Sequence, residues 1–139
     1  MINYKNLFNL VIEVDDEFSP KLSQKIELSE FTSKALKKGH CVFEDGEEQD
    51  IKGVVVGYAN DKVKRYSYIS LVAVGKKYRK QGVAKRLVKQ FVEFASSIPY
   101  IDTIGIHTNN PIALKMYIDL GFVVIEEINR RYYLEYRVR

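Results

Sequence analysis

The residues most suggestive of chemistry form a short run at the start of a predicted helix, Arg79-Lys80-Gln81-Gly82-Val83-Ala84. The first N–H groups of a helix have no partners within the helix, and together with the helix dipole they attract anions. Gly82 has no Cβ, so the backbone can approach a ligand closely there, and the flanking Lys and Arg side chains add attraction. The run therefore predicts a site for a phosphate or pyrophosphate group. A tight turn between a strand and a helix is the alternative interpretation.

A second set of chemically useful side chains begins at Asn110. Asn110 followed by Pro111 is typical of a helix N-terminus, because the Asn side chain caps the first turn and Pro fits the first helical position. Ala113 and Tyr117 lie on the following turns, so one face presents an amide, a small residue and a phenol. Near a phosphate site, the phenol of Tyr117 is able to hydrogen-bond a leaving group. The alternative is that Asn110 only caps the helix and Tyr117 only packs in the core.

The charge distribution indicates an anionic partner. Residues 1–50 hold six basic and eleven acidic residues, a net charge of −5, whereas residues 51–139 hold sixteen basic and seven acidic residues, a net charge of +9. The basic segment 76–89 has seven Lys and Arg and no acid. Nucleic acid, membrane headgroups or a polyphosphate cofactor would fit this charge, with a solvated helix face as the alternative. The phosphate-binding motifs G-x-x-x-x-G-K-[ST] and G-x-G-x-x-G do not occur.

The elements that must position these residues are predicted from the spacing of apolar side chains. Helices are expected at 4–15, 20–38, 82–98 and 111–120, and strands at 41–43, 54–58, 66–74, 101–106, 123–126 and 130–138. A strand is the alternative for 4–15, because its second half is rich in β-branched residues. Ser19-Pro20 is interpreted as the cap and first residue of the second helix. The predicted fold class is α/β (α+β), in the order ααβββαβαββ, with an antiparallel meander inside a central mixed sheet flanked by helices.

Length and composition restrict the class of protein. At 139 residues, 46% hydrophobic and 12% aromatic, the chain is expected to be one soluble globular domain. No apolar run reaches the roughly 18 residues of a membrane span, and the first residues do not resemble a signal peptide, so a cytoplasmic protein without a membrane partner is expected. The single cysteine, Cys41, excludes an internal disulfide framework, and with two histidines no metal site is predicted.

In order and spacing, these motifs resemble the Gcn5-related N-acetyltransferase (GNAT) superfamily. The resemblance rests on two stretches: Leu71-Val72-Ala73-Val74 leading into the run 79–84, and Asn110-x-x-Ala113-x-x-x-Tyr117-x-x-x-Gly121-Phe122. It covers about residues 51–126, and it implies that they form an acetyl-CoA-binding core. It further implies that residues 1–50 form the acceptor side and that residues 127–139 form a closing strand, all within one domain over 1–139.

The resemblance implies acetyl-CoA as the cofactor, with direct attack of an acceptor amine on its thioester in a ternary complex. The amides from Arg79 through Ala84 would hold the CoA pyrophosphate. The backbone of Val72 and Val74 would pair with pantetheine and polarise the thioester carbonyl, and Asn110 would contact the pantetheine arm. Tyr117 would protonate the departing thiolate. The predicted enzyme is an acyltransferase whose acceptor is a small amine, an amino sugar or a protein amine (an N-terminus or a lysine).

The general base is not fixed by this resemblance. Members that acetylate ribosomal-protein N-termini carry a Glu on the strand before Asn110, where this sequence has Gly105. His107 lies two residues later on the same strand face, and we predict that it acts as the base directly or through a water molecule. A structural or surface role for His107 is the alternative.

The acceptor is predicted to meet residues at the end of a strand beside the cofactor strand, namely Tyr58, Asn60 and Asp61. A turn-capping role is the alternative for Asn60 and Asp61. The acidic run Asp15-Asp16-Glu17 lies between the first two predicted helices, where the resemblance places acceptor entry. These carboxylates would attract a cationic amine, with a solvated helix end as the alternative.

Two other classes of function are left open. A catalytically inactive sensor of acyl-CoA would keep every residue named above. A nucleic-acid-binding module would use the basic segment 76–89, with an affinity that falls steeply with salt. It gives no role to Asn110 and Tyr117 at their spacing, so no nucleic-acid partner is predicted. A homodimer is also left open.

Overall fold

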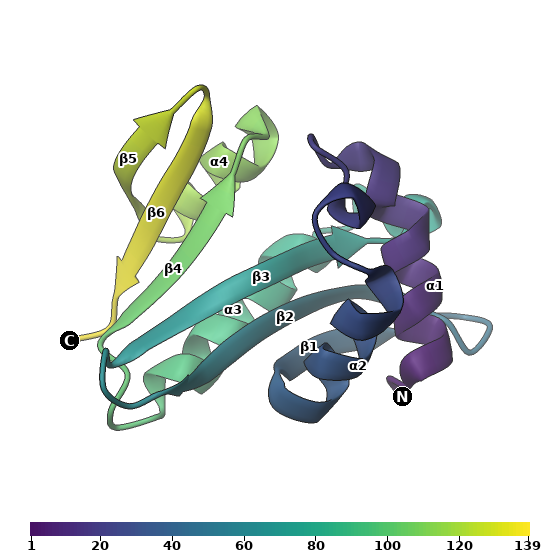
Figure 1. The fold of residues 1–139 in the computed structure, drawn as a ribbon, viewed down its shortest axis with the longest axis horizontal. Coiled ribbons are helices and arrows are strands. Elements are labelled where there is room, and N and C mark those ends of the chain that lie inside the picture. Colours follow the sequence, from purple (N-terminus) through teal and green to yellow (C-terminus); the bar gives the residue numbers. More distant parts are fainter.

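The centre of the fold is a six-stranded sheet with the strand order β1-β2-β3-β4-β6-β5. The structure, a computed structural model, describes all 139 residues. The strands are β1 (His40–Asp45), β2 (Ile51–Asp61), β3 (Tyr66–Val74), β4 (Thr103–Thr108), β5 (Val123–Ile128) and β6 (Arg131–Arg137). The helices are α1 (Tyr4–Val14), α2 (Leu28–Lys38), α3 (Val83–Ser96) and α4 (Pro111–Asp119), with the short 3₁₀ turns η1 (Asp15–Glu17), η2 (Leu22–Gln24) and η3 (Lys76–Tyr78). The predicted mixed sheet flanked by helices is confirmed (Figure 1).

One pair of neighbouring strands, β3 and β4, is parallel, and the others are antiparallel, including the predicted meander β1-β2-β3. β3 and β4 pair only from Tyr66 opposite Thr103 to Ile69 opposite Ile106. Beyond Ile69, β3 continues to Val74 without a partner on that side, and the two strands diverge (Figure 1). The sheet therefore consists of two parts that are joined along a short parallel seam.

Helices cover both faces of the sheet (Figure 1). We call these faces the α1–α2 face and the α3–α4 face, after the helices that pack on them. The core of the α1–α2 face includes the buried side chains Leu7, Val11, Val54 and Leu71. The core of the α3–α4 face includes the buried side chains Ile69, Phe91, Ile104 and Tyr117.

The helix at the N-terminus is confirmed, and its strand alternative is wrong. Asn3 and Asn6 form a capping box, in which each side chain accepts a hydrogen bond of 2.9 Å from the other residue's backbone N–H. This box satisfies donors that the first turn of α1 would leave unpaired. The buried side chains of α1 follow the spacing of one helix face: Leu7, Leu10, Val11 and Val14.

The second helix begins at Leu28, so the prediction that it begins at Pro20 is wrong. The Asp15 carboxylate accepts hydrogen bonds from the backbone N–H (2.7 Å) and the hydroxyl (2.6 Å) of Ser23. These side-chain bonds compete with helix formation and fold residues 15–23 back on the end of α1. Asn109, just after β4, donates from its side-chain amide to the carbonyl of Ser19 at 2.8 Å. The segment between α1 and α2 is therefore fastened to the end of β4.

The strand β5 forms one edge of the sheet, and all six of its residues are exposed. Its large apolar side chains are open to solvent, with Val123 and Ile128 each 59% exposed. Two adjacent carboxylates, Glu126 and Glu127, lie in the middle of this strand.

Candidate functional site

A bulge in β3 marks the place where the two parts of the sheet separate. Val56 and Gly57 of β2 lie opposite Leu71 and Ile69, so Ser70 is an extra residue in β3. Ile69 joins the core of the α3–α4 face, whereas Leu71, two residues later, joins that of the α1–α2 face. The bulge therefore reverses the direction of the side chains next to the seam, and such bulges are typical of active sites.

The unpaired edge of β3 borders the divergence. Beyond the bulge, Val72 and Val74 pair with β2 only, and their side chains contact the core of the α3–α4 face. The Val74 carbonyl accepts hydrogen bonds from Nε (3.2 Å) and Nη2 (3.0 Å) of Arg79. The same guanidinium forms an ion pair of 2.6 Å with Glu17 in η1. Arg79 therefore ties the end of β3 to the segment after α1.

The N-terminus of α3 has the features of an anion site. Gly82 precedes the helix at φ +75° and no side chain caps the first turn, which also contains no acid. An added Cβ at Gly82 would meet only the Arg86 side chain, at 3.3 Å, so the left-handed backbone and not space requires glycine there. Arg86 donates to the carbonyl of Gln81 (2.6 Å) and pairs with Glu44 of β1. The turn is thus fixed by side chains while the first N–H groups of α3 stay free of protein partners.

The predicted cap at Asn110 is confirmed, because its Oδ1 accepts from the N–H groups of Ile112 (2.8 Å) and Ala113 (3.2 Å). Tyr117, on the next turns of α4, is 4% exposed and packs against Phe122. Burial raises the pKa of the Tyr117 phenol, so the group keeps its proton at neutral pH. No protein group hydrogen-bonds this hydroxyl, and no fully buried side-chain polar atom lacks a partner. Its oxygen is therefore not completely buried.

On the α1–α2 face, His107 of β4 and Tyr68 of β3 form a hydrogen bond of 2.7 Å between Nδ1 and the hydroxyl. Burial lowers the pKa of His107, as do the nearby cations Arg131 and Lys25, while Glu126 acts in the opposite direction. The imidazole is therefore neutral at pH 7. When its Nδ1–H donates to Tyr68, the exposed Nε2 carries a lone pair and can accept a proton.

Tyr68 is a candidate functional residue that the sequence analysis missed. It is 39 residues from His107 in the chain, and only the parallel register, which puts Tyr68 opposite Gly105, brings the two side chains together. The signal in the sequence was the alternation of Tyr66, Tyr68 and Ser70 along one predicted strand.

A network of hydroxyl groups lies over Gly105, on the same face of the sheet as His107. The Tyr66 and Tyr133 hydroxyls lie 2.6 Å apart, and the Tyr133 hydroxyl donates to Glu135 at 2.9 Å. A Cβ at Gly105 would overlap both hydroxyls. Glycine therefore makes room for this network, which ends at a carboxylate on β6.

The residues predicted to recognise the acceptor lie apart from the loop before α3. Asn60 and Asp61 end β2 beside Tyr66, at the start of β3, and β3 is about 27 Å long. The Asp61 carboxylate accepts from the backbone N–H of Lys64 at 3.0 Å, which is a turn cap. Tyr58 is half-buried, with the Lys34 ammonium 5.3 Å from its ring centre. An acceptor-binding role for the three residues stays a prediction.

Three further features restrict where a site can lie and what it can hold. No three His, Cys, Asp or Glu side chains gather where they could coordinate a metal ion. None of the helices combines the length and the apolar character that a membrane crossing needs. A cavity of about 240 Å³ lies between α1, residues 48–51 and residues 75–78, and its lining includes neither Gly82 nor His107. This cavity is therefore separate from the turn before α3 and from the His107–Tyr68 pair.

Comparisons with known proteins agree with this geometry. Residues 7–122 match the model of the acetyltransferase (GNAT) family. Among solved structures, a GNAT-family acetyltransferase from Staphylococcus aureus is 17% identical, with 98% of this chain and 93% of that chain covered at a TM-score of 0.76. A mutant of the spermidine N-acetyltransferase SpeG from Vibrio cholerae is 15% identical, with 99% and 92% covered at a TM-score of 0.72. NAA60 from Arabidopsis thaliana, in complex with a bisubstrate analogue, is 20% identical, with 93% and 92% covered at a TM-score of 0.68.

No curated protein sequence matches this chain. The family match extends over most of its residues, and the structural similarity covers nearly all of them. The chain therefore belongs to the GNAT acetyltransferase family. The expected superfamily and the expected enzyme class, an acyltransferase, are confirmed.

Proposed function

We propose that this protein transfers an acetyl group from acetyl-CoA to a primary amine, with both substrates bound together. The observation that carries the proposal is the divergence of β3 from β4 next to an uncapped helix N-terminus. The pantetheine arm, which ends in the thioester, can lie along the free edge of β3 while the pyrophosphate lies at the start of α3. The two positions are joined by the loop 75–82.

The donor side would be held mainly by backbone groups. The N–H groups from Arg79 through Ala84 would bind the pyrophosphate, and the backbone of Val72 and Val74 would pair with the pantetheine arm. The side-chain amide nitrogen of Asn110 has no protein partner and would contact the same arm. Acetyl-CoA would supply an activated acyl group, so the protein must chiefly position an amine and stabilise negative charge on oxygen.

The protons would be handled on the two faces of the sheet. His107 would accept a proton from the attacking amine at Nε2, directly or through a water molecule, while Tyr68 fixes its ring at 2.7 Å. Tyr117, on the opposite face, would donate its proton to the departing sulfur. The acceptor is thus expected beside His107, and its chemical class is a small amine, an amino sugar or a protein amine.

The basic segment 76–89 supports a nucleotide cofactor better than a nucleic acid. Three of its seven cations are already in ion pairs within the protein: Lys77 with Asp50, Arg79 with Glu17, and Arg86 with Glu44. The remaining cations, Lys80 and Lys85 among them, flank the start of α3. This charge suits one polyphosphate at the turn better than a long backbone.

The proposal is tested by calorimetric titration with CoA and by thiol release from acetyl-CoA with a panel of amines. Gly82→Glu puts a carboxylate and a side chain at the anion site, and we expect it to weaken CoA binding about a hundredfold, roughly 3 kcal/mol. Gln90→Glu, on the exposed face of the same helix, is the charge-matched control and should bind CoA normally. Equal affinity of the two variants for CoA would show that the start of α3 does not bind the pyrophosphate. CoA binding without thiol release for any amine would favour the inactive sensor.

A further inference from the structure

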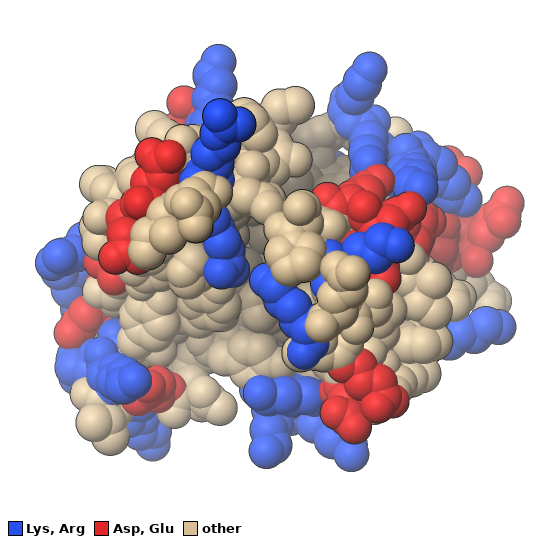
Figure 2. Space-filling view, turned by 45° about the horizontal axis from the view of Figure 1, so that its top comes forward, with Lys and Arg blue, Asp and Glu red and all other residues tan.

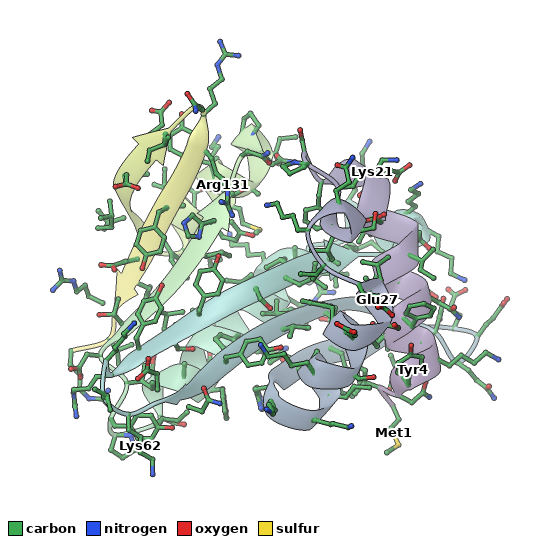
Figure 3. The ribbon with its side chains drawn as sticks, viewed as in Figure 1. Met1, Tyr4, Lys21, Glu27, Lys62 and Arg131 are labelled. Atoms are coloured by element: carbon green, nitrogen blue, oxygen red, sulfur yellow. The ribbon has the colours of Figure 1, made fainter.

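The charges that surround His107 differ from those expected from the sequence. Arg131 lies two residues before Tyr133 on β6, hence on the same face, and Tyr133 lies directly opposite His107. Lys25 follows η2 in the segment that the Asn109–Ser19 hydrogen bond fastens to the end of β4. Burial is the main cause of the lowered pKa of His107, and both cations lower this pKa further. Figure 3 shows Arg131 between β6 and the segment that carries Lys21.

Neither cation has a partner in the protein. The five ion pairs of the structure are Met1 with Asp45, Arg65 with Asp102, Lys77 with Asp50, Arg79 with Glu17, and Arg86 with Glu44. None of them involves Arg131 or Lys25. In the view of Figure 2, Lys and Arg side chains lie around a hollow near the centre, and Asp and Glu side chains lie further out.

The nearby carboxylates, in contrast, are mostly occupied. Asp15 accepts two hydrogen bonds from Ser23, and Glu17 is paired with Arg79. Glu135 accepts from Tyr133. Glu126 is the carboxylate that acts on His107, and it opposes the two cations. The acids at 15–17, expected to attract a cationic amine, are thus largely used within the protein, and the free charge beside His107 is positive on balance.

We infer that the acceptor is a primary amine that also carries a carboxylate or a phosphate, which Arg131 and Lys25 bind while the amine reaches His107. A guanidinium binds either anion through two parallel N–H donors, and a flexible ammonium adds a second positive charge. This inference rests on the proposed function and specifies the substrate class of that same site. It separates this protein from acetyltransferases that act on purely cationic amines.

The test compares amines that differ only in the anionic group: β-alanine with its amide, and O-phosphoethanolamine with ethanolamine. Spermidine serves as the cationic comparison. Initial rates of thiol release from acetyl-CoA are measured at fixed ionic strength and expressed per unprotonated amine, because an adjacent anion raises the pKa of the amine. We expect kcat/KM to be about tenfold higher for the anionic member of a pair, mainly through a lower KM. The pair with the larger ratio of kcat/KM between its anionic and neutral members shows whether the site prefers a carboxylate or a phosphate.

Variants of β6 decide whether Arg131 is responsible. Arg131→Gln and Lys25→Gln should reduce the preference for the anionic amine, and Arg131→Glu should reverse it in favour of spermidine. Arg130→Gln, at the neighbouring exposed turn position, is the matched control and should keep the preference. The reversal by Arg131→Glu requires a folded, active enzyme, so it cannot arise from loss of structure.

The outcomes separate this inference from the proposed function. Equal rates within each pair, a preference for spermidine, or an unchanged preference in Arg131→Gln would overturn the inference and leave the acetyltransferase intact. Absence of thiol release with every amine would overturn the proposed function, and the inference with it.

Discussion

His107 and Tyr117 would handle the two protons of an acyl transfer, and they lie on opposite faces of the sheet. Successive side chains of β4 point to opposite faces of the sheet, so Ile104 and Ile106 join the core of the α3–α4 face while His107 points to the other side. The amine would therefore lose its proton on one face, and the sulfur would gain one on the other. The divergence of β3 and β4 is the connection between them.

The pH dependence of turnover is the first prediction at this scale. The pKa of His107 in the free protein is lowered from its ordinary value of 6.5, so the base form persists to lower pH, and kcat/KM should be lost as pH falls through a midpoint below 6.5. Arg131→Gln removes a cation and should move this midpoint upward. The measurement is a pH profile of kcat/KM, expressed per unprotonated amine. His107→Gln should lower kcat about a hundredfold and abolish the acid limb; an unchanged limb would assign it to another group.

A second residue-scale prediction concerns the phenol of Tyr117. Tyr117→Phe keeps the buried ring but removes the proton donor, so kcat should fall roughly tenfold to a hundredfold while CoA affinity stays nearly intact. Tyr136→Phe is the control, because Tyr136 also packs against Phe122, with ring centres 5.5 Å apart. Thiol release measures kcat, and calorimetry measures the affinity for CoA. Full activity in Tyr117→Phe would exclude the phenol as the acid.

Some of these residues are readable from the sequence and others are not. Gly82 supplies the left-handed backbone before α3, and the Asn110 side chain caps the first turn of α4. Both effects are local, so the sequence pattern suffices to predict each helix N-terminus. Tyr66 meets Tyr133 above Gly105, and Tyr68 meets His107, only because three strands align in one register. Spacing along a chain carries no information on that alignment.

At the scale of elements, α3 lies against β2 at a position where the ring of Phe91 packs directly on the backbone of Gly57. A Cβ on Gly57 would overlap the ring of Phe91, which is completely buried. This close approach positions the N-terminus of α3 relative to the end of β3. The alternating pattern of the strands predicted the sheet. It did not predict the bulge at Ser70, whose hydroxyl donates to Val56 of the neighbouring strand, or the Asp15–Ser23 hydrogen bond in the segment before α2.

The corresponding prediction is a loss of stability in Gly57→Ala. The added methyl group must displace Phe91, and overpacking of this kind costs about 2 kcal/mol in the free energy of unfolding. Gly75→Ala is the control, because its Cβ would meet Tyr78 at 3.4 Å, an ordinary contact, so its effect should stay within about 0.5 kcal/mol. Urea denaturation of the two variants checks this. Equal stability would mean that α3 can shift at no cost.

At the scale of the whole molecule, the two parts of the sheet share only the short seam between β3 and β4. The first part carries β1, β2 and most of β3, and the second carries β4, β6 and β5. A ligand along the free edge of β3 would add contacts where the sheet has none of its own. Its binding free energy would therefore add to the stability of the folded state.

CoA should accordingly raise the melting temperature. At a hundred times its Kd, a ligand that binds only the folded state contributes about 2.7 kcal/mol, which for a chain of this length shifts Tm by about 9 °C. A thermal scan with and without CoA measures the shift, and Gly82→Glu, whose affinity is expected to be about a hundredfold lower, should shift by only about 1 °C at the same concentration. A shift of equal size in that variant would indicate binding at another place.

The edge strand β5 has a consequence for how copies of this protein meet. Its outer row of N–H and C=O groups is unpaired, so an extended peptide could add to it as a further strand. Such an addition would also bury the exposed valines and isoleucines of β5. Glu126 and Glu127 oppose it, since two molecules aligned along this strand would bring four negative charges together. Concentrated salt, which screens these charges, should therefore favour pairing of two molecules along β5.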